Sequence, residues 1–141
     1  MKRILTLLLI IPLLSMTIEN DKAKFIGKWI GEDEKEIGYS NFDSEGYAYF
    51  EVQGQIMGGK EFVRKGKKGN MTYEINSKTN PIQVNLVVTM LEPKEQKKLL
   101  CIANFIDHDT MEFAISFDEN RPTEFDSENS LIFKREKQKN E

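Results

Sequence analysis

The chain has 141 residues, a length that suits one domain, and its 20 basic and 23 acidic side chains give a formal net charge of −3. Phosphate binding needs a basic face, so this balance argues against nucleic acid as a partner and equally against electrostatic binding to an anionic membrane. Cys101 is the only cysteine, which excludes an intrachain disulfide. Its apolar neighbours indicate a small buried side chain, and a reactive or interchain thiol is the alternative.

The first 17 residues have the pattern of a secretory signal peptide. Lys2 and Arg3 form a short basic start, and the apolar run at residues 4–14 is shorter than the roughly 20 residues that span a membrane. Ser15 and Thr17 are small residues that precede a cleavage after Thr17. An uncleaved anchor or a buried N-terminal segment is the alternative. Because no cysteine follows this run, we predict a secreted or periplasmic protein without lipid attachment and without a membrane span after processing.

Short strands separated by turns are predicted for the first half of the remaining chain. In the first strand, at residues 25–31, Gly27 lies on the same face as Trp29, the only tryptophan, and leaves room for a close chain segment. The next strands are predicted at 37–42, 47–52, 61–64 and 71–75. Residues 53–59 contain three glycines, of which Gly58-Gly59 suggest a hairpin turn or a flexible rim loop. The basic cluster at 64–68 suggests a solvated turn.

Three long strands at residues 82–90, 99–106 and 110–117 form the centre of the prediction. Apolar and polar residues alternate along the first and third of them, which is the pattern of a strand with one buried face. Turns at 92–96 and 107–109 connect them, and a last strand follows at 130–135. We count eight or nine strands and no useful amphipathic helix. The fold class is therefore all-β, a single antiparallel up-and-down barrel whose sheet curls onto itself.

No arrangement typical of catalysis appears in the sequence. A hydrolytic triad needs a histidine near a nucleophile, but the only histidine, His108, lies in a tight turn between two aspartates. A metal site needs three or four ligands, and side chains splay apart in such a turn. Glu51, Glu74 and Glu112 alternate outward with the polar faces, so none is placed for sugar chemistry. We predict no enzyme activity, no catalytic residue, no metal site and no cofactor.

Several segments resemble a known family. Gly27-Lys28-Trp29 resembles the Gly-x-Trp signature of lipocalins. Later segments, in order, resemble a lipocalin-like (calycin-type) domain of secreted bacterial proteins, a family of mostly uncharacterised members. These segments are residues 71–75, 80–86, 107–111, 121–125 and 131–137. His108 stands where that family usually has glycine. The resemblance predicts a lipocalin-like barrel over residues 18–137, followed by a disordered tail at 138–141.

The resemblance also implies how the barrel is closed at one end. In lipocalins the tryptophan of the first strand packs under a basic side chain from near the chain's end. Arg135 shares a face with Leu131 and Phe133, so it is one candidate for a cation–π contact with Trp29, and Arg121 of the Arg121-Pro122 pair is the other. Gly27, Trp29, Arg121, Pro122 and Arg135 are therefore the predicted structural residues.

Two functions from different classes remain open. In the first, the barrel binds a small apolar or amphiphilic molecule, with walls formed by Trp29, Tyr73, Leu86, Val88, Phe113, Ile115 and Phe133. In the second, the interior is filled by aromatic rings, and the loops or outer face bind another protein or the cell envelope. An interior void of about 300 Å³ or more would suit a ligand, whereas scattered small gaps would suit the filled barrel.

Overall fold

The computed structural model describes residues 22–32 and 37–137. The predicted signal peptide at residues 1–17, its cleavage after Thr17 and the predicted tail at 138–141 lie outside these residues. No helix among the described residues is long and apolar enough to cross a membrane.

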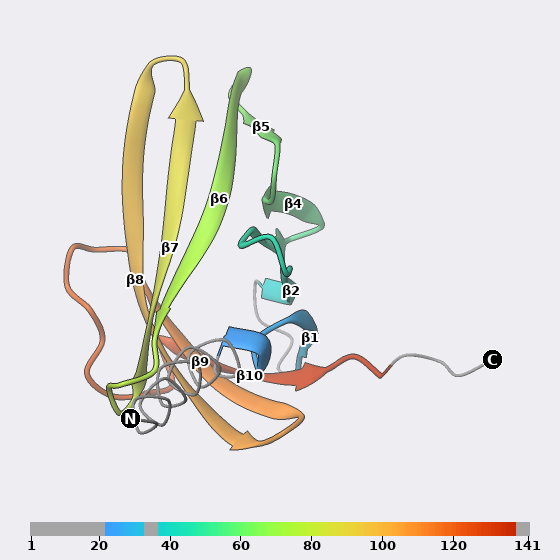
Figure 1. Ribbon diagram of the computed structural model, residues 1–141, viewed down its shortest axis with the longest axis vertical. Helices are drawn as coiled ribbons and strands as arrows, with labels where there is room; N and C mark the ends of the chain where they lie inside the picture. The colour runs from blue at the N-terminus through green and yellow to red at the C-terminus, as the bar shows by residue number, and fades with distance from the viewer. Residues whose placement is uncertain (1–21, 33–36, 138–141) are drawn as a thin grey trace, which may run out of the picture.

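The described residues form one antiparallel sheet of ten strands, which curls into a nearly closed barrel (Figure 1). The strands are β1 (Gly27–Gly31), β2 (Ile37–Phe42), β3 (Ala48–Val52), β4 (Gln55–Gly58), β5 (Phe62–Arg64), β6 (Lys67–Asn76), β7 (Ile82–Leu91), β8 (Lys94–Asp107), β9 (Thr110–Ser116) and β10 (Ser130–Arg135). Their order in the sheet is β4-β3-β2-β1-β10-β9-β8-β7-β6-β5. The predicted all-β antiparallel barrel is confirmed, but the predicted count of eight or nine strands is wrong.

The additional strand is β4, which lies in the segment predicted as a turn or rim loop. Gln53 and Gly54, between β3 and β4, both have positive φ, at 51° and 83°. Two such residues form the tight turn whose twist matches a hairpin, and glycine adopts this conformation without steric cost. The chain therefore reverses at once and pairs again, with Val52 opposite Gln55. The hairpin turn is therefore at Gln53-Gly54 and not at the predicted Gly58-Gly59, since Gly58 is the last residue of β4.

The seam of the barrel lies between the β3–β4 end of the sheet and β6. The two end strands of the sheet are β4 and β5, and the link across the seam is short. Tyr47 and Thr72 form an isolated antiparallel bridge. The backbone N–H of Tyr73 donates to the carbonyl of Gly46 at 3.0 Å, and that of Met71 donates to the carbonyl of Gly59 at 2.9 Å. These bonds satisfy backbone groups that would otherwise be left at an open edge.

Strands β6, β7 and β8 are longer than the others and rise beyond them as a tall wall (Figure 1). They have 10, 10 and 14 residues, whereas β1, β2 and β3 have five or six. The turn predicted at 92–96 is shorter in the structure, because the pairing of β7 with β8 continues to Leu91 and Lys94. The basic cluster at 64–68 is not wholly a turn either, since Arg64 pairs directly with Lys67.

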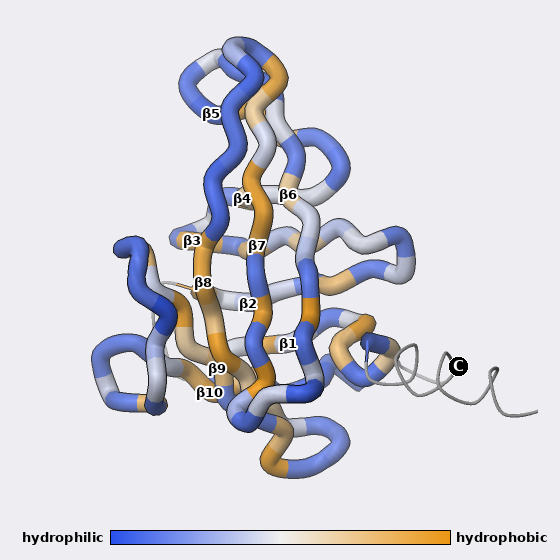
Figure 2. Tube along the Cα trace, turned by 60° about the vertical axis from the view of Figure 1, so that its left-hand side comes forward, coloured by the Kyte–Doolittle hydropathy of each residue, from blue (hydrophilic) through white to orange (hydrophobic). Residues whose placement is uncertain are grey.

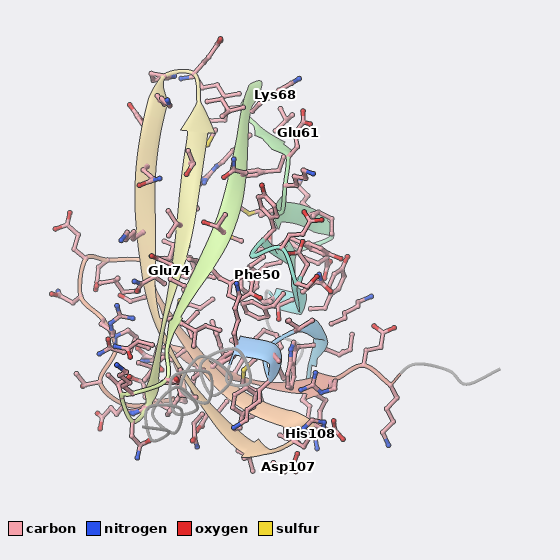
Figure 3. The ribbon with its side chains drawn as sticks, in the orientation of Figure 1. Phe50, Glu61, Lys68, Glu74, Asp107 and His108 are labelled. Carbon is pink, nitrogen blue, oxygen red and sulfur yellow. The ribbon has the colours of Figure 1, made fainter. Side chains whose placement is uncertain are left out.

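The barrel has a lower half and an upper half, named from the orientation of Figure 1. The lower half contains the β8–β9 turn, which holds Asp107 and His108, and Glu61 and Lys68 mark the far end of the tall wall (Figure 3). Along β8 the upper part is hydrophilic and the lower part hydrophobic (Figure 2). This change in one strand indicates that the two halves have different interiors.

Candidate functional site

Aromatic rings fill the lower half of the barrel. Trp29 is fully buried, and its indole Nε1 donates a hydrogen bond to the carbonyl of Phe25 at 2.8 Å. The Phe25 ring meets the Phe105 ring edge to face, with centroids 4.9 Å apart. A second run of ring contacts continues through the core, and it joins Phe42 to Tyr73, Phe50 and Phe113, and Phe113 to Phe133. Contacts of this kind add stability beyond the burial of area.

Arg135 closes this packed base from outside. Its guanidinium lies over the Trp29 ring, with the central carbon 4.2 Å from the ring centroid. Its Nη1 and Nη2 donate to the carbonyls of Ile26 and Lys24, both at 2.9 Å. Its Nε lies 3.2 Å from a carboxylate oxygen of Asp109. A planar guanidinium can make all these contacts at once, which fixes the β8–β9 turn and the chain before β1 against the base.

Gly27 makes this closure possible. A Cβ on residue 27 would lie 3.2 Å from Nη1 of Arg135, so a side chain there would crowd the guanidinium. The φ of Gly27 is also +130°, a conformation that other residues rarely adopt. The glycine two residues before the tryptophan therefore accommodates the arginine that covers it.

Arg121 has a different position from Arg135. Its Nη1 donates to the carbonyl of Cys101 at 2.8 Å and to that of Val84 at 3.3 Å, and its Nη2 donates to Oδ1 of Asn85 at 2.6 Å. Pro122 is half-buried beside it. Arg121 therefore fastens the long β9–β10 loop to β7 and β8, and Arg135 is the arginine that lies over Trp29.

The upper half of the barrel contains a cavity of about 570 Å³. Its walls come from β2–β9 and from Phe117 just after β9, and they include no tryptophan. The apolar lining residues are Ile37, Phe50, Val52, Met57, Phe62, Met71, Leu86, Val88, Met90, Leu99, Ile115 and Phe117. The polar lining residues are Arg64, Lys65, Lys67, Glu95, Gln96 and Lys97, which are all exposed. The cavity thus has an apolar body that opens to solvent at a charged rim.

The residues predicted as ligand walls divide between the two halves. Leu86, Val88 and Ile115 line the cavity. Trp29, Tyr73, Phe113 and Phe133 do not line it, because they are buried in the packed base. Sequence reasoning also missed wall residues, including Phe50, Met71 and Leu99. Strand parity offered a signal for the last two, since Met71 shares a face with Tyr73, and Leu99 shares one with Cys101 and Ala103.

A second, shallower hollow of about 1000 Å³ adjoins the cavity along the β9–β10 loop. The two share Ile37, Val52, Met57, Ile115 and Phe117 as lining residues. The loop side of this hollow is acidic, with Asp118, Glu124, Asp126 and Glu128 against the single cation Arg121. The mouth of the barrel therefore has a basic side at β5–β8 and an acidic side at the loop.

Two buried side chains with ionisable protons, Tyr73 and Cys101, lie in the interior of the barrel. Burial raises the pKa of the Tyr73 phenol to about 12, and the nearby Asp43 carboxylate adds to the shift. The Tyr73 hydroxyl donates to the carbonyl of Asp43 at 2.7 Å. Burial likewise raises the pKa of the Cys101 thiol to about 12, against the opposing effect of Arg121. Both groups stay neutral at physiological pH, so the thiol is a poor nucleophile.

His108 lies at the lower end of the barrel, far from Glu61 and Lys68 at the upper end (Figure 3). Its side chain is 82% exposed, and its Nε2 lies 4.0 Å from an Asp109 oxygen. The backbone N–H of Asp109 donates to Asp107 Oδ1 at 2.8 Å, a bond that lowers the pKa of the Asp107 carboxyl. The carboxylate of Asp107 thus serves the turn itself. In the described part of the chain, no three potential metal ligands gather into a group.

No protein-family model matches this sequence, and comparison with curated proteins and with solved structures finds no match. The resemblance to lipocalin-like domains therefore stays a prediction from the sequence.

Proposed function

We propose that this chain is a lipocalin-like barrel that binds a small apolar or amphiphilic molecule in its upper half. The observation that carries the proposal is the cavity of about 570 Å³ above the packed base. Small-molecule sites typically measure about 300–1,000 Å³ and are lined mostly by apolar side chains with a few polar groups. The cavity has this size and this lining, so it supports ligand binding over the completely filled barrel that binds an envelope protein.

In this proposal, the ligand would contact two inward positions of β7. Leu86 and Val88 lie on the same face of β7, and their partners across β6 are Tyr73 and Met71. Leu86 is 1% exposed, and Val88 is half-buried because it borders the cavity. Burial of apolar ligand surface against such walls contributes about 25 cal/mol per Å².

A fluorescence titration tests this proposal. The probe is N-phenyl-1-naphthylamine, which is neutral and brightens in apolar surroundings, excited beyond the tryptophan absorption. Val88→Trp would place a large indole ring in the cavity and is expected to remove most of the signal. The matched control is Thr89→Trp on the neighbouring residue, which is half-buried but is not part of the cavity lining, and we expect it to retain the signal. Equal signals from both variants, or no signal from the unmodified protein, would contradict the proposal.

We also propose that the protein is exported after cleavage of residues 1–17. The support is the basic start and the short apolar run at 4–14. The test is the intact mass of the protein isolated from its host. A mass that begins at Ile18 is the expected result, and the mass of the full chain would contradict it.

A further inference from the structure

The cavity rim concentrates positive charge in a chain whose overall charge is negative. Four basic side chains, Arg64, Lys65, Lys67 and Lys97, line the cavity against one carboxylate, Glu95, which leaves a local charge of +3. The whole chain has a formal net charge of −3. We infer that the ligand of this cavity is an anionic amphiphile, with its apolar body inside the barrel and its negative head group at this rim. The inference rests on the proposed function and names the chemistry of its ligand.

Strand register places two of these lysines on the inner face of the tall wall. Lys97 lies directly opposite Val88 across β7 and β8, and Val88 lines the cavity. Residues directly opposite in an antiparallel pair project from the same face of the sheet. Lys67 lies directly opposite Arg64 across β5 and β6, and both line the cavity. These cations therefore lie at the end of the apolar wall, where the head group of a bound amphiphile would emerge from the cavity.

The neighbouring lysines on the outer face form ion pairs within the chain. Lys68 forms an ion pair with Glu61 at 3.3 Å, and Lys98 forms one with Glu74 at 3.5 Å. Neither lines the cavity. By contrast, none of the ion pairs among the described residues involves Arg64, Lys65, Lys67 or Lys97. Each outer lysine thus has a carboxylate of this chain, and the inner cations have their charge available to a ligand.

The carboxylates on the acidic side of the mouth are less available to a cationic head group than the basic rim is to an anionic one. Asp118 already accepts hydrogen bonds from the Ser116 hydroxyl and the Asn120 N–H, at 2.7 and 2.8 Å. Asp126 accepts from the N–H groups of Glu128 and Asn129, at 2.9 and 2.8 Å. These carboxylates hold the β9–β10 loop in shape, and they line the adjoining hollow rather than the cavity. Their repulsion would direct an anionic head group towards the basic wall.

The length of the apolar wall indicates the size of ligand to use as a probe. Inward apolar positions on β7 run from Leu86 to Met90, a distance of about 13 Å at the usual rise of an extended strand. We therefore choose three ligands with the same ten-carbon chain and different head groups. They are decanoate, which is anionic, decan-1-ol, which is neutral, and decyltrimethylammonium, which is cationic.

The test measures how well each ligand displaces N-phenyl-1-naphthylamine from the full chain. We expect decanoate to displace the probe at lower concentration than decan-1-ol, and the cation to be the weakest of the three. Added salt should weaken decanoate and leave decan-1-ol unchanged, because screening acts on charges. In the double variant Lys67→Gln/Lys97→Gln, decanoate binding should weaken about tenfold, as expected for the loss of contacts from two charged donors.

The matched control is Lys68→Gln/Lys98→Gln, which removes the same charge from adjacent residues on the opposite face. It should weaken decanoate binding by less than about twofold, because its charges lie across the sheet, near the screening distance. Unfolding midpoints of both variants show that each is folded. Neutral ligand binding should be the same in both.

The outcomes separate this inference from the proposed function. If the neutral probe binds, but decanoate and decan-1-ol compete equally or the inner and outer variants behave alike, the anionic ligand is wrong and the apolar cavity stands. If the neutral probe does not bind, the proposed function fails and this inference fails with it. A further arm uses phosphatidylglycerol vesicles. Vesicle binding that both double variants weaken equally, without a preference for decanoate, would also overturn the inference, since it would indicate a membrane surface contact.

Discussion

The two halves of this barrel share strands β2, β3 and β6–β9, but the interior of the lower half is packed and that of the upper half contains a cavity. In the lower half, Trp29, Phe42 and Phe133 are fully buried, and Arg135 covers the end. In the upper half, the same inward face has Val88 and Leu99 and encloses a cavity of about 570 Å³. The two interiors differ because the inward side chains of the lower half are larger than those of the upper half. We therefore expect the packed lower half to supply most of the stability of the fold.

The largest expected effect comes from emptying the packed base. Trp29→Ala removes a fully buried ring that contacts Phe105 and Arg135. A change of this kind costs about 3–5 kcal/mol in unfolding free energy. Urea unfolding measures it. A loss below about 1 kcal/mol would contradict the role of the tryptophan in the base. The control is Val63→Ala in β5, where the residue is 63% exposed, with an expected effect within about 0.5 kcal/mol.

The next effect concerns the arginine over that ring. Arg135→Leu loses the contact with Trp29 and the hydrogen bonds to the carbonyls of Ile26 and Lys24. We expect a loss of about 2–3 kcal/mol, from charged hydrogen bonds and a cation–π contact. His108→Ala is the control, because Arg135 binds only the backbone carbonyl of His108. The control should leave the unfolding midpoint unchanged. An Arg135→Leu variant as stable as this control would contradict the closure described above.

A smaller effect, which depends on pH, comes from the buried phenol. Tyr73→Phe loses the hydrogen bond to Asp43, at a cost of about 1 kcal/mol near neutral pH. An unfolded tyrosine loses its proton near pH 10, whereas folded Tyr73 keeps it to about 12. Its raised pKa therefore favours folding fully below pH 10, and this contribution is lost as pH rises towards 12.

The measurement is the urea midpoint as a function of pH. Cys101 adds a second loss that begins near pH 9, since burial raises its thiol pKa from 9.0 to about 12. In the Tyr73→Phe variant, the fall in urea midpoint that begins near pH 9 should remain. Above pH 10 its midpoint should fall less steeply than that of the unmodified protein. If the variant and the unmodified protein have the same slope above pH 10, Tyr73 is not shielded in the way described.

The smallest effect is expected in the upper half. Val88→Ala removes two methyl groups that border the cavity, where packing partners are absent on one side. We expect a loss below about 1 kcal/mol, less than for a similar change in a filled core. Ile115→Val sharpens the comparison, because this residue is 9% exposed and lines the same cavity. A loss at Val88 as large as that at Trp29 would remove the distinction between the halves.

The sequence predicted the fold class because alternation is a local property. Ile82 to Met90 and Met111 to Phe117 alternate with polar residues, and this pattern requires a sheet with one buried face. It did not predict β4, because Gln53-Gly54 resembles a loop until its partner strand is known. The start of β8 was missed because residues 94–98 are polar on both faces, so they carry no period-two signal.

The position of the cavity was less predictable than the barrel. Phe113 and Ile115 share one face of β9, yet only Ile115 lines the cavity. The difference depends on neighbours from distant strands, such as Phe42 and Phe50 beside Phe113. The basic residues of the cavity rim could not be predicted for another reason. Lys67 and Lys68 are both lysines in a segment predicted as a turn, and only their place in strand β6 shows that Lys67 lines the cavity and Lys68 does not.

The most direct test of the central claim is a methyl NMR titration of the protein with N-phenyl-1-naphthylamine. A hollow upper half predicts shifts at Leu86, Val88 and Ile115, which line the cavity, and unchanged signals at Met111 and Ala103 in the base. Saturable shifts confined to the first group would support the account. An absence of shifts at Leu86, Val88 and Ile115, or shifts only at the exposed Ile106 and Leu91, would contradict it.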